Sequence, residues 1–261
     1  LIDGCTNVEF KHTDIGQDIF GGGLGAVEMV DHDNDPATPE QEIITSADIS
    51  GNTFVFFNRG NLITSIYWDP QECVFKEQIC GIKDEVNYRD TPSDIAHNLY
   101  GGGNMACTIG TKINGNLVAG TGNATVYMIG APVVDPSFMS SKYYTDAMAI
   151  YGKPHFSAFG AGYGKEAKVL GNTYSDIALT SAGFHSVVGG GMNGPVEGEC
   201  FTHIACDAEN TLIHDIYGGG YYAPCEKTEL DITRGTILEN VFGGSVMGNI
   251  TPYQRDNDGN L

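Results

Sequence analysis

Large apolar residues along this chain are followed by runs of glycine at recurring intervals. The full pattern, one aliphatic or aromatic residue and then three glycines, occurs after Phe20, Tyr100, Val188 and Tyr217, and looser copies follow Phe159 and Phe242. With 36 glycines in 261 residues, a random order would give only about 0.7 triple-glycine runs. The four observed runs therefore indicate a structural repeat. We call each copy a glycine word.

The spacing of the glycine words predicts the length of that repeat. Their first glycines are at positions 21, 101, 160, 189, 218 and 243. From Gly160 onward the words follow one another at intervals of roughly 25–29 residues, a period typical of solenoids, propellers and arrays. Gly51, Gly81 and Gly130 divide the longer intervals into units of similar length, as degenerate copies would. This interpretation gives about nine repeats of ~29 residues.

A second pattern, Gly-Asn followed by β-prone residues, lies between the glycine words. Its copies are Gly51-Asn52, Gly122-Asn123, Gly171-Asn172 and Gly248-Asn249. Both residue types accept a positive φ, so the dipeptide is suited to a corner. The short run that follows each corner is rich in Val, Ile, Thr, Tyr and Phe, which is typical of a strand.

Together the two patterns predict an all-β chain that folds as a right-handed parallel β-helix, a solenoid with inserted loops. Each strand would pair with its copy one repeat away, and the residue before each glycine run would point inward and stack. We expect a single domain over 1–261, least regular at 51–99, with insertions at 24–50 and 134–158. The polar acidic end predicts a fragment of a longer exported protein.

The acidic composition limits the classes of binding partner. The formal net charge is -20, from 33 acidic against 13 basic residues. This charge repels nucleic acid and anionic membrane surfaces and favours cations. No apolar stretch reaches the roughly 18 residues that a membrane-spanning helix needs, so no transmembrane segment is predicted.

The predicted excursions from the repeat carry tyrosines that are candidates for ligand binding. They are Tyr143, Tyr144, Tyr151, Tyr163, Tyr221 and Tyr222. Loops that leave a repeat usually emerge on one face, and tyrosines beside Asp and Asn can stack on sugars or on another protein. The alternative is that these rings seal the edge of the core.

Calcium is the metal ion best supported by the sequence. In two acidic segments, side chains with possible oxygen ligands occur at every second position. The first segment contains Asp31, Asp33 and Asp35, and the second contains Asp256, Asp258 and Asn260. Such alternation is typical of calcium loops. The alternative is a solvated acidic loop, because the first segment has Pro36 where a calcium loop has glycine.

The seven cysteines form no Cys-x-x-Cys pair. Cys200, His203 and Cys206 could offer three zinc ligands, but residues three apart in a strand point to opposite faces. We therefore expect buried structural thiols. A loop disulfide between Cys73 and Cys80 remains open.

The glycine words and Gly-Asn corners resemble the glycine-rich β-helix repeats of large surface proteins from Bacteroidetes-type gut bacteria. The resemblance covers about 60% of the chain and implies an extracellular or cell-surface, adhesin-like or structural role, with glycan or protein as partner. It transfers no catalytic residue. One alternative is a carbohydrate-active β-helix enzyme, either a polysaccharide lyase or a glycoside hydrolase, although no two carboxylates can be paired from the sequence. Another is a lectin-like carbohydrate-binding module.

Overall fold

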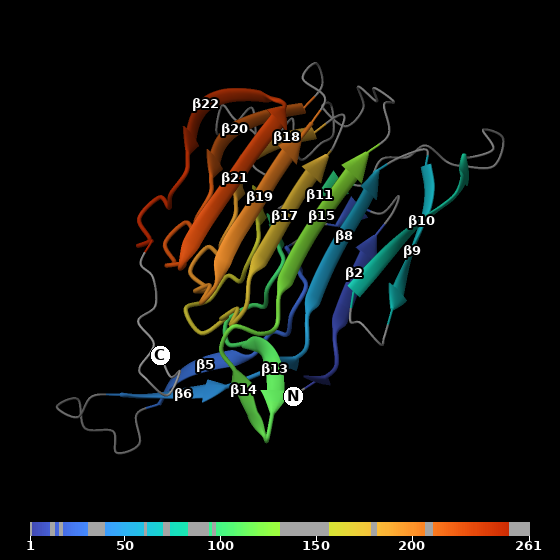
Figure 1. Cartoon of the computed structure of the whole chain (residues 1–261). Helices are drawn as coiled ribbons and strands as arrows, with labels where there is room; N and C mark the ends of the chain where they lie inside the picture. Colours follow the sequence, from blue (N-terminus) through green and yellow to red (C-terminus); the bar gives the residue numbers. More distant parts are fainter. Residues whose placement is uncertain are drawn as a thin grey trace.

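A computed structural model describes residues 2–250 except 11–13, 16–17, 31–39, 60–61, 70–73, 83–93, 96–97, 131–156, 179–181 and 207–210. Within these described residues the chain is all-β and contains no helix (Figure 1). It follows that no described segment is a helix capable of spanning a membrane. Most strands belong to two six-stranded parallel sheets.

The first sheet has the strand order β2-β8-β15-β17-β19-β21, and its strands lie side by side in sequence order (Figure 1). All five of its pairings are parallel. The strands are β2 (Thr6–Phe10), β8 (Thr53–Arg59), β15 (Ala124–Gly130), β17 (Thr173–Ala178), β19 (Glu199–Ala205) and β21 (Lys227–Arg234).

The second sheet has the order β4-β12-β16-β18-β20-β22, which is again the order of the sequence. Its pairings are also parallel. The strands are β4 (Ile19–Phe20), β12 (Asn98–Tyr100), β16 (Ser157–Phe159), β18 (Ala182–Val188), β20 (Thr211–Tyr217) and β22 (Thr236–Phe242). From β17 onward the chain alternates between the two sheets.

A third, narrower strip of parallel pairings lies outside the two large sheets. It contains β1 (Ile2–Asp3), β7 (Ile49–Ser50) and the start of β13 (Ile109–Ile113). Single bridges extend it from Ile109 to Val169 and from Val169 to Val196. Five segments of the chain are thus joined in this strip, again in sequence order.

The remaining described strands form small additions to this framework. Antiparallel hairpins are made by β5 (Ala26–Val30) with β6 (Gln41–Thr45), by β9 (Leu62–Asp69) with β10 (Val74–Ile82), and by β13 with β14 (Asn116–Val118). A two-residue parallel pair joins β3 (Asp14–Ile15) to β11 (Asp94–Ile95). Asn114 and Gly115 both have positive φ in the β13–β14 turn, as a two-residue hairpin of type I′ requires.

The expected insertions correspond only in part to these additions. Residues 24–50 contain the β5–β6 hairpin, but they end in β7, which returns to the third strip. Residues 51–99 contribute β8 to the first sheet and β12 to the second, besides the β9–β10 hairpin. Most of 134–158 lies outside the described residues.

The glycine words stack directly on one another, as the sequence predicts. The amide of Gly21 donates to the carbonyl of Tyr100, and the same bond recurs from each later word to the next. However, β4 pairs directly with β12, so no further word lies between Phe20 and Tyr100 in this sheet. In the same way β12 pairs directly with β16, so no further word lies between Tyr100 and Phe159. The interpretation of Gly51, Gly81 and Gly130 as degenerate words is therefore wrong. The described residues give six strands in each large sheet, not nine repeats.

Close backbone contact explains why the first position of each word is glycine. A Cβ on Gly101, Gly160 or Gly189 would lie closer than 3.0 Å to the carbonyl oxygen of the first glycine in the next word. Real Cβ atoms do not approach backbone oxygens so closely. Only glycine lets adjacent repeats keep the strand spacing of about 4.8 Å at this corner.

The aromatic residues before the glycines stack in a row, but they do not enter the central core. The rings of Phe20 and Tyr100 are 4.7 Å apart, and those of Tyr100 and Phe159 are 4.9 Å apart. The preceding residue in each strand, such as Leu99, packs in the central core instead. The expected stacking is confirmed, and Tyr100 and Phe159 are buried. Because alternate strand residues face opposite sides, however, they lie on the side of the strand away from the central core, so the expected inward direction is wrong. The row forms a separate cluster that Met192 and Tyr221 contact.

Side-chain hydrogen bonds join the repeats at the Gly-Asn corners. The Oδ1 atom of Asn52 accepts the amide of Asn123, that of Asn123 accepts the amide of Asn172, and that of Asn172 accepts the amide of Glu199, at 2.8–3.0 Å. The threonine after the corner bonds across the interior, since Thr173 Oγ1 donates to Gly189 O at 2.6 Å. The predicted corners are therefore also points of attachment between repeats.

The interior divides into two apolar clusters. The first lies between the two large sheets and includes Val55, Val126, Ile177 and Ile204 with Leu99, Val187 and Ile216. The second lies behind the third strip and includes Ile49, Ile109, Val169 and Val196 with the thiols of Cys107, Cys200 and Cys225. Each fully buried aliphatic side chain contributes about 1.5–3 kcal/mol, so the stacked repeats are held by side chains from every face.

The close contact between glycines of adjacent repeats predicts that a glycine-to-alanine substitution destabilises the protein at some positions and not at others. Gly189→Ala should destabilise the protein by at least about 2 kcal/mol, because the new methyl group overlaps the carbonyl of Gly218. Urea unfolding followed by circular dichroism measures the change. Gly243→Ala is the matched control, since a Cβ there meets nothing within 4 Å. It should stay within about 1 kcal/mol of wild type. Equal losses in both variants would contradict the explanation.

Candidate functional site

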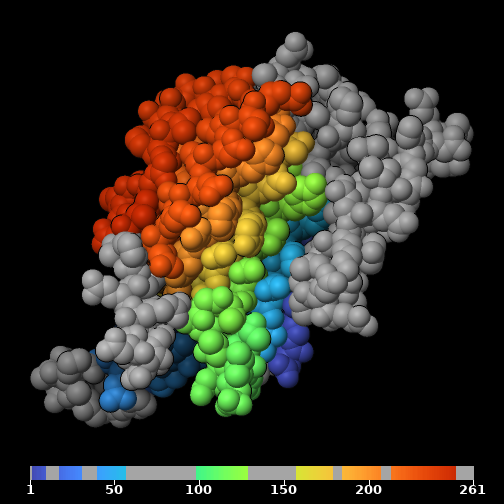
Figure 2. Space-filling view, viewed as in Figure 1, coloured from blue at the N-terminus to red at the C-terminus, as the bar shows by residue number. Residues whose placement is uncertain are grey.

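A shallow groove of about 370 Å³ lies on the outer face of the first sheet. The face is formed by alternate residues of β15, β17, β19 and β21, because every second side chain of these strands enters the core. The bands of these strands lie next to one another in Figure 2. The outward lining residues are Thr125, Tyr127, Tyr174, Asp176, Phe201, His203, Glu229 and Asp231.

Aromatic rings form one side of the groove. Tyr174 and Phe201, which are register partners, stack with centroids 5.1 Å apart and planes 5° apart. The other register neighbour of Tyr174 is the small residue Thr125, so one face of the Tyr174 ring borders a gap. Tyr174 is 37% exposed, and its hydroxyl accepts a hydrogen bond from Asn172 Nδ2 at 3.2 Å. The ring is therefore both accessible and held in place.

Polar and charged groups form the other side. Asp176, His203 and Asp231 are consecutive partners across β17, β19 and β21. Asp176 Oδ1 lies 2.9 Å from His203 Nδ1, and both side chains are 43% exposed. Glu229 on the neighbouring row adds a third carboxylate. The groove thus offers an aromatic face, hydrogen-bond acceptors and net negative charge.

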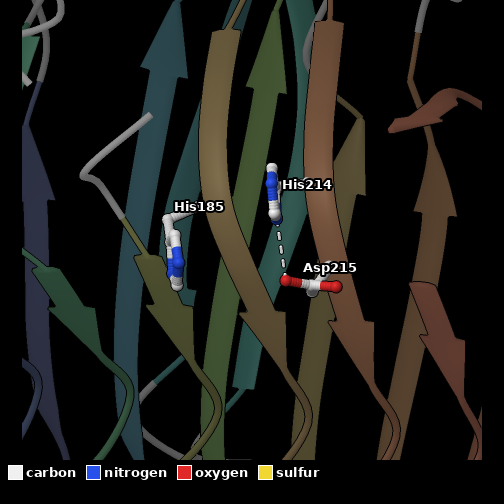
Figure 3. Close-up of side chains that lie close together, drawn as sticks. All are labelled: His185, His214 and Asp215. Atoms are coloured by element: carbon white, nitrogen blue, oxygen red, sulfur yellow. Dashed lines mark hydrogen bonds and ion pairs between the residues drawn. The ribbon is translucent and has the colours of Figure 1, made fainter. Parts of the chain in front are cut away.

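A histidine–aspartate cluster lies on the second sheet (Figure 3). His185 on β18 and His214 on β20 have nearly parallel rings, with centroids 5.7 Å apart and planes 12° apart. His214 Nδ1 lies 2.8 Å from Asp215 Oδ2. The β20–β22 register shifts between Ile213 and Asp215. This irregularity is consistent with two successive side chains, His214 and Asp215, meeting on one face.

The carboxylate of Asp215 is held by several groups although its side chain is only 10% exposed. Burial raises the pKa of the Asp215 carboxyl, but hydrogen bonds to His214 and Asn240, together with the electrostatic effects of His214 and His185, lower it below its ordinary value. Asn240 Nδ2 donates to Asp215 Oδ1 at 3.0 Å. On the far side of the ring, His214 Nε2 lies 3.1 Å from Glu239 Oε1. The pKa of Tyr217 is raised by burial and by the nearby Asp215 charge.

Three of the six candidate ligand tyrosines lie among the described residues. Tyr163 and Tyr222 are exposed, at 40% and 44%, whereas Tyr221 is half-buried. Tyr163 meets the ring of Tyr100 edge-on, and Tyr221 meets Phe159 in the same way. These contacts correspond to the alternative in which the rings cover the core edge. Tyr143, Tyr144 and Tyr151 lie outside the described residues.

The candidate calcium ligands lie entirely outside the described residues. They are Asp31, Asp33, Asp35, Asp256, Asp258 and Asn260. Among the described residues, the one group of His, Cys, Asp or Glu side chains with ligand atoms close enough for a metal ion is His185, His214 and Asp215. The sequence analysis did not combine these three.

The described cysteines agree with the prediction of buried thiols. Cys107, Cys200, Cys206 and Cys225 are buried thiols, and Cys5 is a half-buried thiol. Cys200 and Cys206 point inward, whereas His203 lies on the outer groove, so the three do not form a zinc site. Cys73 and the side chain of Cys80 lie outside the described part.

Sequence reasoning missed both the groove and the histidine cluster, although a signal was present. His185 and His214 are separated by one repeat length, and so are Asp176 and His203. In a stacked repeat, residues one period apart are lateral neighbours. The Asn114-Gly115 hairpin was missed too, although Asn-Gly is a strong hairpin signal.

No family model, curated protein or solved structure matches this chain.

Thiol alkylation at pH 8 should distinguish Cys107 from Cys5. Burial raises the pKa of Cys107 to about 11, although the amide of Gly23 donates to its Sγ at 3.1 Å. Only about one Cys107 thiol in a thousand is then a thiolate at pH 8. We expect iodoacetamide to modify Cys5 in the native protein and Cys107 only after unfolding, as peptide mass spectrometry would measure. Native labelling of Cys107 at the rate of Cys5 would contradict its burial.

Proposed function

We propose that this chain is a non-enzymatic, cell-surface β-solenoid that binds uncharged or amino-bearing glycans in the groove of the first sheet. The solenoid is the right-handed parallel β-helix that the repeat predicts. The role is adhesin-like: the stacked repeats form a rigid support, and the groove attaches it to a carbohydrate. The observation that carries the proposal is the exposed Tyr174 ring in the same groove as the carboxylates of Asp176, Glu229 and Asp231.

Parallel stacking in sequence order supports the solenoid. From β17 onward the chain passes through the first sheet, the second sheet and the third strip in turn, and then enters the first sheet again. Each of these segments pairs with its counterpart about one repeat length away. Parallel crossover connections are right-handed in nearly all proteins, which supports the proposed hand.

The chemistry of the groove supports a carbohydrate. A sugar ring presents apolar C–H groups on its faces and hydroxyl groups at its edge. The free face of the Tyr174 ring can pack against the C–H groups. The carboxylates of Asp176, Glu229 and Asp231 can accept hydrogen bonds from the hydroxyl groups. The net charge of -20 disfavours acidic polysaccharides. The resemblance to bacterial surface repeats adds the expectation of a cell-surface location.

A carbohydrate-active enzyme is the second candidate. Asp176 and Asp231 lie on either side of His203 and are two strands apart, which corresponds to roughly 9–10 Å between their backbones. Inverting glycosidases use carboxylates about 6.5–9.5 Å apart. We favour binding over catalysis because the groove is shallow and the two side chains of the Asp176–His203 pair are 43% exposed, whereas a catalytic acid is commonly desolvated.

The test is a glycan array followed by calorimetry with the best ligand. We expect Tyr174→Ala to weaken binding at least about tenfold, because the aromatic face is lost. Tyr174→Phe keeps that face and should bind within a few-fold of wild type. Asp176→Asn should also weaken binding, since it removes a charged acceptor.

Two results would contradict this assignment. If Tyr222→Ala rather than Tyr174→Ala abolished binding, the ligand would lie on the tyrosine loops instead of the groove. If wild type released new reducing ends or unsaturated products from the bound glycan, and Asp231→Asn did not, the protein would be an enzyme. No binding to any glycan on the array would overturn the proposal as a whole.

A further inference from the structure

We propose that His185, His214 and Asp215 form a binding site for a divalent transition-metal ion, with zinc as the representative ion. The site lies on the second sheet, away from the groove on the first sheet, and it is independent of glycan binding. It spans β18 and β20 and borders β22 (Figure 3).

The ligand atoms already lie close together. One atom from each of the three side chains can be chosen so that all lie within 4.8 Å of one another. Ligands of a tetrahedral zinc ion, at about 2.0–2.1 Å from the metal, are roughly 3.4 Å apart. The Nδ1 atom of His214 and the Oδ2 atom of Asp215 are 2.8 Å apart, so these two atoms would separate slightly to admit the ion, and the His185 ligand atom would adjust its position within the 4.8 Å limit. Glu239, 3.1 Å from His214 Nε2, adds a carboxylate beside the set.

The carboxylates of Asp215 and Glu239 beside His214 favour the binding of a cation. Both ring nitrogens face carboxylate oxygens, Nδ1 that of Asp215 and Nε2 that of Glu239. A neutral imidazole can donate from only one nitrogen. The other contact then places a lone pair against a negative oxygen unless a proton or a metal ion lies there. Among the described residues, no Lys or Arg forms an ion pair with either carboxylate.

The surrounding groups restrain the ligands in the way that metal sites require. Asn240 donates to Asp215 Oδ1 and leaves Oδ2 directed at His214. Ser186 Oγ lies 3.0 Å from His185 Nδ1 and contributes to the orientation of that ring. Such outer contacts fix ring orientation and tautomer in metal sites. Because His185 and His214 come from neighbouring repeats, a bound ion would link the repeats.

The donor set selects the class of metal. Imidazole nitrogens suit zinc, copper, nickel and iron, whereas calcium and magnesium prefer sites made of oxygen alone. Two histidines and one carboxylate therefore point to a transition metal. This site differs from the calcium loops expected from the sequence in both ligands and position.

The experiment is calorimetric titration of the purified, chelator-treated chain with zinc chloride and, separately, with calcium chloride. We expect one zinc ion per chain and no calcium binding at these residues. His185→Gln and His214→Gln should each weaken zinc binding at least about tenfold, in line with the effect of losing contacts at a metal site. The melting temperature of wild type should rise with zinc and return with EDTA.

Glu199→Gln is the matched control, since this glutamate pairs with Lys227 on the first sheet and lies outside both sites. It should bind zinc as wild type does. If His214→Gln disturbs folding, which circular dichroism would reveal, His185→Gln is the deciding variant, because His185 is not part of the hydrogen bonds that join His214, Asp215 and Asn240. Absence of zinc binding would overturn the proposal. Undiminished binding in His185→Gln would overturn it as well.

Discussion

The rest of the structure depends on direct backbone contact between glycines of adjacent repeats. The first carbonyl oxygen of each glycine word lies where a Cβ on the first glycine of the preceding word would be, so any larger residue would separate the two repeats. With glycine present, the parallel ladder continues without interruption around the corner. This contact keeps neighbouring repeats at strand spacing, and the asparagine and threonine hydrogen bonds then join them at other corners.

One consequence is that side chains occur in rows. A residue type that appears at the same position in two repeats becomes a pair of lateral neighbours. The stacked Tyr174 and Phe201 rings and the parallel rings of His185 and His214 both arise in this way. The groove and the histidine–aspartate cluster therefore arise in the same way, from short rows of side chains on different sheets. They differ only in the chemistry of the residues placed there.

Much of this could be anticipated from local patterns, and the failures have physical causes. The glycine words and Gly-Asn corners were predicted correctly because glycine and asparagine have conformational freedom that other residues lack. The inward direction of Tyr100 was predicted wrongly, since strand alternation made Leu99 the core residue. Gly51, Gly81 and Gly130 were assigned as repeats because composition alone cannot distinguish a corner or a hairpin from a glycine word.

The sequence by itself determined the all-β class, the repeat and the corners, because these depend on the conformations of single residues and their spacing. Only the tertiary structure decided that β4 pairs directly with the distant β12 and which polar residues meet. His185, His214 and Asp215 are brought together by the register between strands and by its irregularity near Asp215. Register depends on how whole repeats pack against each other, and no single residue encodes it.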